Sequence, residues 1–213
     1  IIFRLFKIRS VFKSCQVIHA LDGWPYGFLA VLFSQGLDIK VVITAIGTGA
    51  IKPLYHPIKK KLLAWAYRKA DKVTAISNNT KREILKIIPD LKIEVINHGV
   101  DFDKFQTPVH EYQEIGVLRP YILSVGTLKK RKGYNYSIKA FAQIAPKFPD
   151  LKYVIVGQGP ERDALNLQLT TYNLQHRVTF LNNLSEESLI NLYQNAELFI
   201  LLPQDDNKDI EGF

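Results

Sequence analysis

The sequence predicts an α/β protein in which helices cover parallel sheets. Apolar segments of strand length alternate with segments of helical periodicity, and short connections join them, which is typical of parallel α/β layers. The 213 residues have 47% hydrophobic content, which is enough for one large buried core or two small ones. The composition therefore indicates a globular chain.

Eight segments are predicted as strands, and two of the helical segments have clear starting signals. The strands are expected at Gln16–Ala20, Lys40–Ala45, Lys72–Ser77, Ile93–Ile96, Tyr121–Gly126, Leu151–Val156, Arg177–Leu181 and Leu198–Leu202. Apolar residues at helical spacing begin directly after Gly133 and again after Ser185, whose side chain is suited to cap a helix. Each of these helices should bury one stripe against a sheet.

A polar segment between Gly99 and Pro120 divides the chain. It contains Pro108 and Gly116 and shows no periodicity, which indicates a link between two α/β halves. The expected divisions are a first domain at residues 1–106, a link at 107–120 and a second domain at 121–213.

Positive charge is concentrated in the first domain. Residues 1–106 contain 17 Lys and Arg against 8 Asp and Glu, whereas residues 107–213 contain 11 against 12. Clusters such as Lys59–Lys61 suit an anionic membrane surface, the phosphates of a nucleic acid, or simply a solvated helix face. A nucleic acid is disfavoured, because aromatic residues do not alternate with these cations and no zinc-finger pattern is present.

A second group of cations follows the strand that should end at Gly126. Lys129, Lys130, Arg131 and Lys132 occupy a turn that leads into a helical segment. Arginine offers a planar fork of donors and lysine a point charge, so such a turn can hold a diphosphate without a metal. The plain alternative is a solvated basic turn.

Other polar motifs indicate turns rather than ligand sites. The segment Gly157–Pro160 lacks the third glycine of a dinucleotide loop, so we interpret it as a tight turn with Pro160 at the first position of a helix. Asp101 and Asp103 are spaced like a metal-binding pair, but they stand where the link begins and predict a turn. The five histidines show no ligand spacing. We therefore expect no metal site.

The cysteine content bears on the cellular location of the protein. The single cysteine, Cys15, excludes an intramolecular disulfide and fits a reducing compartment, so we expect a cytoplasmic protein, peripheral on the inner face of a membrane. No apolar run approaches the roughly 20 residues of a spanning helix.

The chain starts at Ile1 and contains no methionine, which indicates an interior piece of a longer protein.

Five motifs, in order along the chain, are similar to those of one enzyme family. They are Ala70–Ser77 (ADKVTAIS), Ile96–Asp101 (INHGVD), Leu123–Gly133 (LSVGTLKKRKG), Val154–Pro160 (VIVGQGP) and Glu211–Phe213 (EGF). Their order and spacing resemble the GT-B glycosyltransferases of the retaining family 4, the glycosyl transferases group 1. The resemblance implies two Rossmann-like parallel-sheet domains, both of them incomplete in this chain.

The resemblance also implies a chemistry and a set of site residues. In such enzymes a nucleoside-diphosphate sugar, such as a UDP- or GDP-sugar, is the donor, and the acceptor hydroxyl attacks with retention. Arg131 and Lys132 match the cations that stabilise the leaving diphosphate in place of a metal, and Glu211 matches a glutamate that contacts the donor. No cofactor is expected. Further donor contacts are predicted at Gly126 and Thr127 and, for the base, at Leu181, Asn182 and Leu184.

The acceptor implied by the resemblance is a saccharide or a lipid-linked molecule, as in polysaccharide, glycolipid or cell-envelope biosynthesis. Two positions depart from the family pattern, because Ile46 stands where many relatives carry histidine and His98 replaces an asparagine. The chain also ends before the second glutamate of its last motif, so we expect this piece alone to be inactive. Two alternatives stay open: a noncatalytic phosphate-binding or scaffold protein of the same fold, and a basic nucleic-acid-binding domain.

Overall fold

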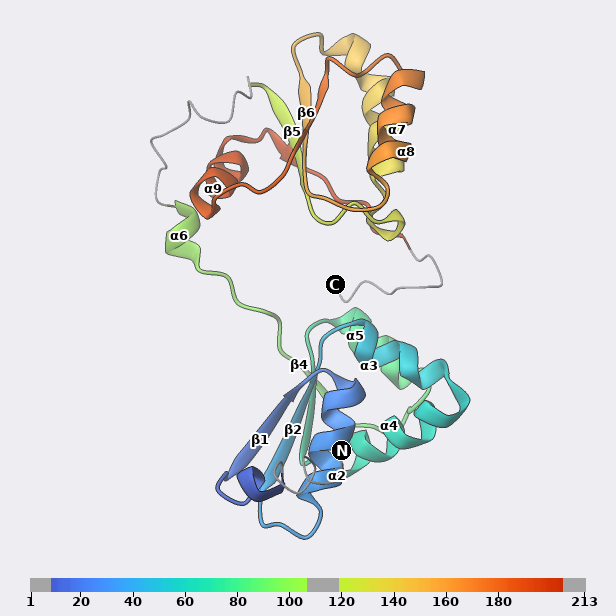
Figure 1. Ribbon diagram of the computed structural model, residues 1–213, viewed down its shortest axis with the longest axis vertical. Coiled ribbons are helices and arrows are strands. Elements are labelled where there is room, and N and C mark those ends of the chain that lie inside the picture. Colours follow the sequence, from blue (N-terminus) through green and yellow to red (C-terminus); the bar gives the residue numbers. More distant parts are fainter. Residues whose placement is uncertain (1–8, 107–118, 205–213) are drawn as a thin grey trace. The chain divides into compact units, whose positions relative to one another are not determined.

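The computed structural model describes residues 9–106 and 119–204, which form two compact units. The first unit ends at Gly99 and the second begins at Val100 (Figure 1). In the part of the chain that the structure describes, no helix has the length and apolar character needed to cross a bilayer.

The first unit contains a four-stranded parallel sheet. Its strands are β1 (Val17–Leu21), β2 (Lys40–Ala45), β3 (Lys72–Ala75) and β4 (Ile93–Val95), in the order β1-β2-β3-β4. All four predicted strands are confirmed. Strand β3 ends two residues before the predicted Ser77, because the Ser77 hydroxyl accepts a hydrogen bond from the Thr80 amide at 3.1 Å and caps the next helix.

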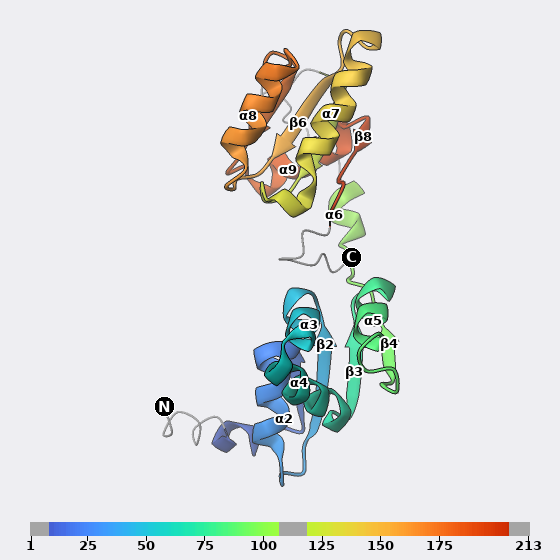
Figure 2. The same cartoon turned by 90° about the vertical axis from the view of Figure 1, so that its right-hand side faces the viewer.

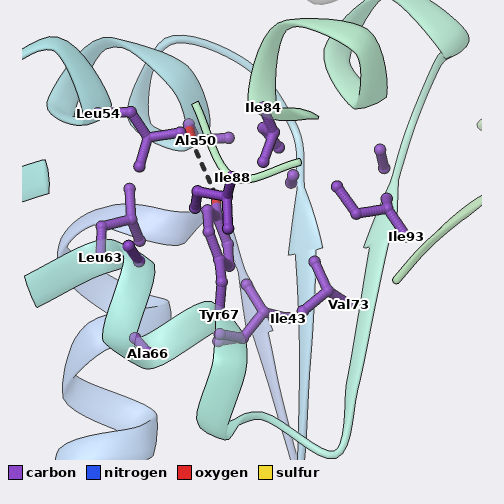
Figure 3. Close-up of a cluster of buried hydrophobic side chains, with 14 of the residues drawn as sticks. Ile43, Ala50, Leu54, Leu63, Ala66, Tyr67, Val73, Ile84, Ile88 and Ile93 are labelled. Atoms are coloured by element: carbon purple, nitrogen blue, oxygen red, sulfur yellow. Dashed lines mark hydrogen bonds between the residues drawn. The ribbon is translucent and has the colours of Figure 1, made fainter. Parts of the chain in front are cut away.

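Helices cover one face of this sheet. They are η1 (Gly23–Gly27), α2 (Phe28–Ser34), α3 (Thr48–Ile51), η2 (Lys52–Tyr55), α4 (Pro57–Lys69) and α5 (Asn78–Leu85). Figure 2 shows α2, α3 and α4 together on one side of the strands. The core between them contains Ile43, Leu63 and Ile84, and the buried Tyr67 hydroxyl donates to the Ala50 carbonyl at 3.0 Å (Figure 3).

The second unit contains another four-stranded parallel sheet. Its strands are β5 (Tyr121–Val125), β6 (Lys152–Val156), β7 (Val178–Leu181) and β8 (Leu198–Phe199), in the order β7-β6-β5-β8. These strands confirm the remaining four predictions and, with the first sheet, the α/β class. Strand β8 is shorter than the predicted Leu198–Leu202: the Ile200 carbonyl accepts from the Ser124 side chain of β5, and the Leu202 backbone lies against Gly133.

Helices lie on both faces of the second sheet. They are α6 (Phe102–Gln106), η3 (Lys130–Lys132), α7 (Tyr134–Ile144), η4 (Ala145–Lys147), α8 (Arg162–Thr171) and α9 (Glu186–Asn195). Helices α7 and α8 pack on the face that carries Ile122 and Ile155, whereas Leu192 of α9 packs on the face that carries Leu123 and Val154. Two covered faces make this a doubly wound, Rossmann-like unit.

The boundary between the units falls earlier than the expected residue 106. Helix α6 belongs to the second unit because the Gln194 side chain donates to the Phe105 carbonyl at 2.8 Å and the Phe105 ring contacts Tyr193. The turn expected at Asp101 is instead a helix start, where the Asp101 carboxylate accepts from the Lys104 amide at 3.2 Å. Residues 107–118 of the expected link lie outside the described residues.

Candidate functional site

The basic turn of the second unit directly follows β5. Its four cations are in two environments: Lys129 and Lys130 are exposed, whereas Arg131 and Lys132 are partly buried. The last three form the short helix η3, and the chain then passes through Gly133 into α7. The turn therefore holds two of its cations against the protein, and these are the two predicted to be catalytic.

Gly133 fixes this turn against the segment that follows β8. Its φ of 69° is in the left-handed region, and an added Cβ would lie 2.9 Å from the carbonyl carbon of Leu202. Two residues further on, the Gln204 amide donates to the Arg131 carbonyl at 2.6 Å. The loops after β5 and β8 are thus held together by backbone contacts.

These two loops meet at the topological switch point of the sheet. In the order β7-β6-β5-β8, the chain moves from β5 to β6 on one side, while β8 lies on the other side of β5. In open α/β sheets, ligands bind outside the carboxyl ends of the strands at this point. The basic turn is therefore placed where this kind of fold binds its ligand.

Lys132 and Gly126 come together at the end of β5. A Cβ added at Gly126 would lie 4.0 Å from the Lys132 Cε, so the lysine stem folds back toward the strand end. The Tyr134 hydroxyl donates to the Gly126 carbonyl at 2.8 Å. Burial raises the pKa of Tyr134, so its hydroxyl is a neutral donor at ordinary pH. Sequence reasoning missed Tyr134 as part of this site.

The loop after β6 connects the basic turn to β7. The Leu128 amide donates to the Gln158 carbonyl at 2.9 Å, and the Leu128 carbonyl accepts from the Glu161 amide at 3.0 Å. This second bond holds Glu161 outside the helix, so α8 begins at Arg162. The prediction that Pro160 occupies the first helical position was wrong, because Pro160 lies in the preceding turn.

The predicted base-binding residues lie at the same edge of the sheet. The Gly157 amide donates to the Leu181 carbonyl at 2.8 Å, and the Gln158 side chain donates to the Asn183 side chain at 3.0 Å. Asn183 lies between the predicted Asn182 and Leu184, and its φ of 51° is in the left-handed region, which an Asn-Asn pair after a strand often signals. Asn182 is exposed, and Leu184 packs against the α9 side of the core.

The remaining two predicted site residues are placed differently. Thr127 is exposed at the start of the turn, and its carbonyl accepts from the Lys129 amide at 2.8 Å. Glu211 lies outside the described residues, which end at Gln204. The roles of all the site residues stay predictions, and what the structure adds is that Gly126, Lys132 and Leu181 share one edge of one sheet.

A buried set of hydroxyl groups links the strands and the helix that lie next to the basic turn. The Tyr153 hydroxyl on β6 donates to the Ser137 hydroxyl on α7 at 2.8 Å and is 2.7 Å from the Ser124 hydroxyl on β5. The Ser124 hydroxyl also donates to the Ile200 carbonyl, and the Ser137 hydroxyl donates to the Tyr134 carbonyl at 2.9 Å. These bonds tie together the three elements that flank the basic turn and the segment after β8.

Replacing Tyr153 with phenylalanine should lower the free energy of unfolding by about 1 kcal/mol, because it removes a buried, satisfied hydroxyl without opening a cavity. The matched control is Tyr136→Phe, which changes an exposed tyrosine of α7 and should stay within about 0.5 kcal/mol of the parent protein. Urea denaturation measures both variants. Equal losses for the two variants would contradict a role for the buried hydroxyl set.

The first unit has its own cluster of loops at the carboxyl end of its sheet. Asp22 follows β1, and its carboxylate accepts from the Gly23 amide at 2.8 Å and from the backbone of Ile46 and Gly49. Burial raises the pKa of Asp22, and these backbone donors pull it down in part. Asp22 therefore pins the loop that carries Ile46, the position where the family pattern has histidine.

The described residues contain no cluster of metal ligands. Across residues 9–106 and 119–204, no group of three or more His, Cys, Asp or Glu side chains is placed to hold a metal ion. The basic turn at the edge of the second sheet carries four cations, which suit an anion.

The second unit is a doubly wound α/β unit whose basic turn lies at its switch point. Residues 105–213 match the family described as "Glycosyl transferases group 1", and residues 1–104 match "Glycosyltransferase Family 4". The chain therefore belongs to the group 1 glycosyl transferases. The family predicted from the sequence motifs is confirmed.

Individual relatives agree with this assignment. The chain is 24% identical to the N-acetyl-alpha-D-glucosaminyl L-malate synthase of Bacillus anthracis over 90% of its own length and 51% of that protein. It is 26% identical to a GDP-mannose-dependent alpha-(1-6)-phosphatidylinositol monomannoside mannosyltransferase of Mycolicibacterium smegmatis, over 68% of the chain and 40% of the relative. The chain thus spans about half the length, or less, of these relatives.

A solved structure shows the same fold. The structure of Anabaena HepE in complex with UDP matches 92% of this chain and 55% of that protein, with a TM-score of 0.77 and 20% sequence identity. Together with the two parallel sheets, this similarity confirms the predicted fold class, which is two Rossmann-like parallel-sheet units of the GT-B type.

Proposed function

We propose that this chain provides the diphosphate-binding part of a retaining glycosyltransferase that moves a sugar from a nucleoside-diphosphate sugar to an acceptor hydroxyl. The observation that carries the proposal is the placement of Lys132 against Gly126 at the switch point of the second sheet. Membership of the group 1 glycosyl transferases supports the proposed transfer reaction. The protein would act in the cytoplasm or on the inner face of a membrane.

The proposed chemistry follows from charge. When the bond between the sugar and the diphosphate breaks, negative charge grows on the leaving phosphate oxygens. A cation that is already in position stabilises that charge more than it stabilises the bound donor, and this difference accelerates the reaction. Lys132 and Arg131 would supply the cations, and α7, which starts at Tyr134, adds the positive end of its helix dipole.

The donor and acceptor classes rest on the relatives. HepE was solved with UDP, and the M. smegmatis relative is named for GDP-mannose and a phosphatidylinositol mannoside. We therefore propose a UDP- or GDP-sugar as donor and a saccharide or lipid-linked molecule as acceptor, in polysaccharide, glycolipid or envelope synthesis. The base would meet Leu181, Asn182 and Leu184 beyond β7.

Sugar transfer should continue when divalent metals are removed, because the cations of the basic turn replace the metal at the leaving diphosphate. The measurement is transfer from UDP- and GDP-sugars by the full gene product that contains this chain, with and without EDTA. An unchanged rate in EDTA is the expected result. Loss of transfer in EDTA, recovered by added Mg²⁺ or Mn²⁺, would contradict the proposed site.

The noncatalytic alternative makes a different prediction in the same assay. A phosphate-binding or scaffold protein of this fold would bind the nucleotide sugar but release no nucleoside diphosphate, whatever acceptor is added. Calorimetric binding of a UDP- or GDP-sugar without product, across soluble and lipid-linked acceptors, would favour that alternative over an enzyme.

A further inference from the structure

Helix α4 of the first unit has one buried face and one face that exposes apolar side chains. Leu63, Ala66 and Tyr67 point into the core (Figure 3). On the other side Ile58 is 68% exposed and Leu62 is 37% exposed. These two residues are four positions apart, so they lie next to each other on the helix surface. Ile58 and Leu62 therefore form a short apolar stripe on α4 that is exposed to solvent.

Exposed cations flank this stripe. Lys61 follows Ile58 by three positions and Lys69 follows Leu62 by seven, so both lie beside the stripe, whereas Lys60 points to another side of the helix. Arg68 is engaged differently, because its guanidinium binds the Asp90 carboxylate through bonds of 2.8 and 3.1 Å. The lysines thus give this face its net positive charge, and Arg68 holds α4 against the segment after α5.

A hollow of about 510 Å³ lies beside the stripe. Its walls are Lys60, Lys61, Ala64, Trp65, Arg68, Lys69, Ile87 and Ile88. Trp65 is partly buried and meets the Phe28 ring edge-on at a centroid distance of 6.1 Å, so its indole is held in place. An aromatic floor with cations around it suits the region where lipid headgroups meet acyl chains, because tryptophan concentrates there.

We propose that this face of α4, defined by Ile58, Lys61, Leu62 and Lys69, docks on an anionic membrane surface. The apolar stripe enters the interface between headgroups and acyl chains, and the lysines bind the lipid phosphates. The apolar stripe favours a membrane over a nucleic acid as the partner of this face, because binding to a phosphate backbone would leave Ile58 and Leu62 exposed to water. Docking of this kind brings the enzyme to lipid-linked acceptors without a spanning helix.

The test is co-sedimentation of the full gene product with two kinds of vesicle, phosphatidylcholine alone and phosphatidylcholine with about 30% phosphatidylglycerol. The protein should sediment with the anionic vesicles, and added salt should weaken this binding because it screens the lysines. Ile58→Glu, and separately the pair Lys61→Glu with Lys69→Glu, should each weaken binding by about tenfold or more.

Matched controls change other surfaces in the same way. Leu167→Glu alters an apolar residue of α8 that is 70% exposed, and the pair Lys139→Glu with Lys147→Glu makes the same charge change in the second unit. Both controls should bind vesicles within about twofold of the parent protein. Circular dichroism checks that all variants are folded.

Three results would overturn the proposal. They are equal binding to neutral and anionic vesicles, equal losses in the α4 variants and the controls, and salt-sensitive binding of an oligonucleotide that displaces the vesicles. The proposed sugar transfer is tested apart from docking, because transfer to a soluble acceptor should survive the α4 variants. Failure of one proposal therefore does not imply failure of the other.

Discussion

Replacing Lys132 with alanine should lower the turnover of the full gene product by about 100-fold or more. That factor is the usual effect of removing one preorganised electrostatic partner, about 2.7–4 kcal/mol of transition-state stabilisation. The structure gives the reason, since the Lys132 stem folds back to Gly126 at the carboxyl end of β5. The Michaelis constant for the donor should change less than turnover, because the stabilised charge grows only as the bond breaks.

Lys130 provides the control for this experiment. It belongs to the same turn and carries the same charge, but its side chain is exposed. Screening by water makes an exposed charge weak, so Lys130→Ala should leave turnover close to that of the parent protein. Initial rates with UDP- and GDP-sugars decide the matter. Turnover that falls equally in both variants would mean that the overall charge of the turn, and not the position of Lys132, is what counts.

The strands of the second unit could be predicted because parallel strands covered on both faces are continuous apolar runs. Strand β5 is the clearest case, with Tyr121 and Leu123 fully buried on one face and Ile122 nearly so on the other. Strand β8 was predicted three residues too long, although Ile200–Leu202 are equally apolar. The Ser124 hydroxyl binds the Ile200 carbonyl, and Leu202 packs against Gly133. Those partners are about 70 residues away in the chain, so local sequence carries no sign of them.

The candidate site, like the strands, could be predicted only in part from the sequence. Lys129–Lys132 and the glycines could be predicted, because a turn of cations after a strand is a local pattern. The contact of the turn with Leu202 and its connection to Asn183 depend on the order β7-β6-β5-β8, which no single segment encodes. Asp22 was missed for the same reason, since its carboxylate serves a loop that follows a different strand.

Gly133→Ala should lower the stability of the second unit by about 2–5 kcal/mol. Two costs add: about 1–2 kcal/mol for an alanine held in the left-handed region, and about 1–3 kcal/mol for displaced neighbours. The second cost arises because the new Cβ would lie 2.9 Å from the Leu202 carbonyl carbon, and backbone cannot move aside as a side chain can. The loops after β5 and β8 should separate, so affinity for a nucleotide sugar should fall as well.

Gly36→Ala separates the two costs. Gly36 has nearly the same φ, 72°, but an added Cβ there would meet only the end of the Arg9 side chain, at 3.8 Å. It should therefore lose about 1–2 kcal/mol, the left-handed cost alone. The gain that alanine brings by restricting the unfolded chain is the same at both positions and cancels in the comparison. Hydrogen–deuterium exchange of peptides covering β2 and β5 reports each unit separately. Equal losses at the two glycines would show that the Leu202 backbone does not constrain the basic turn, and that its geometry depends on Gly133 alone.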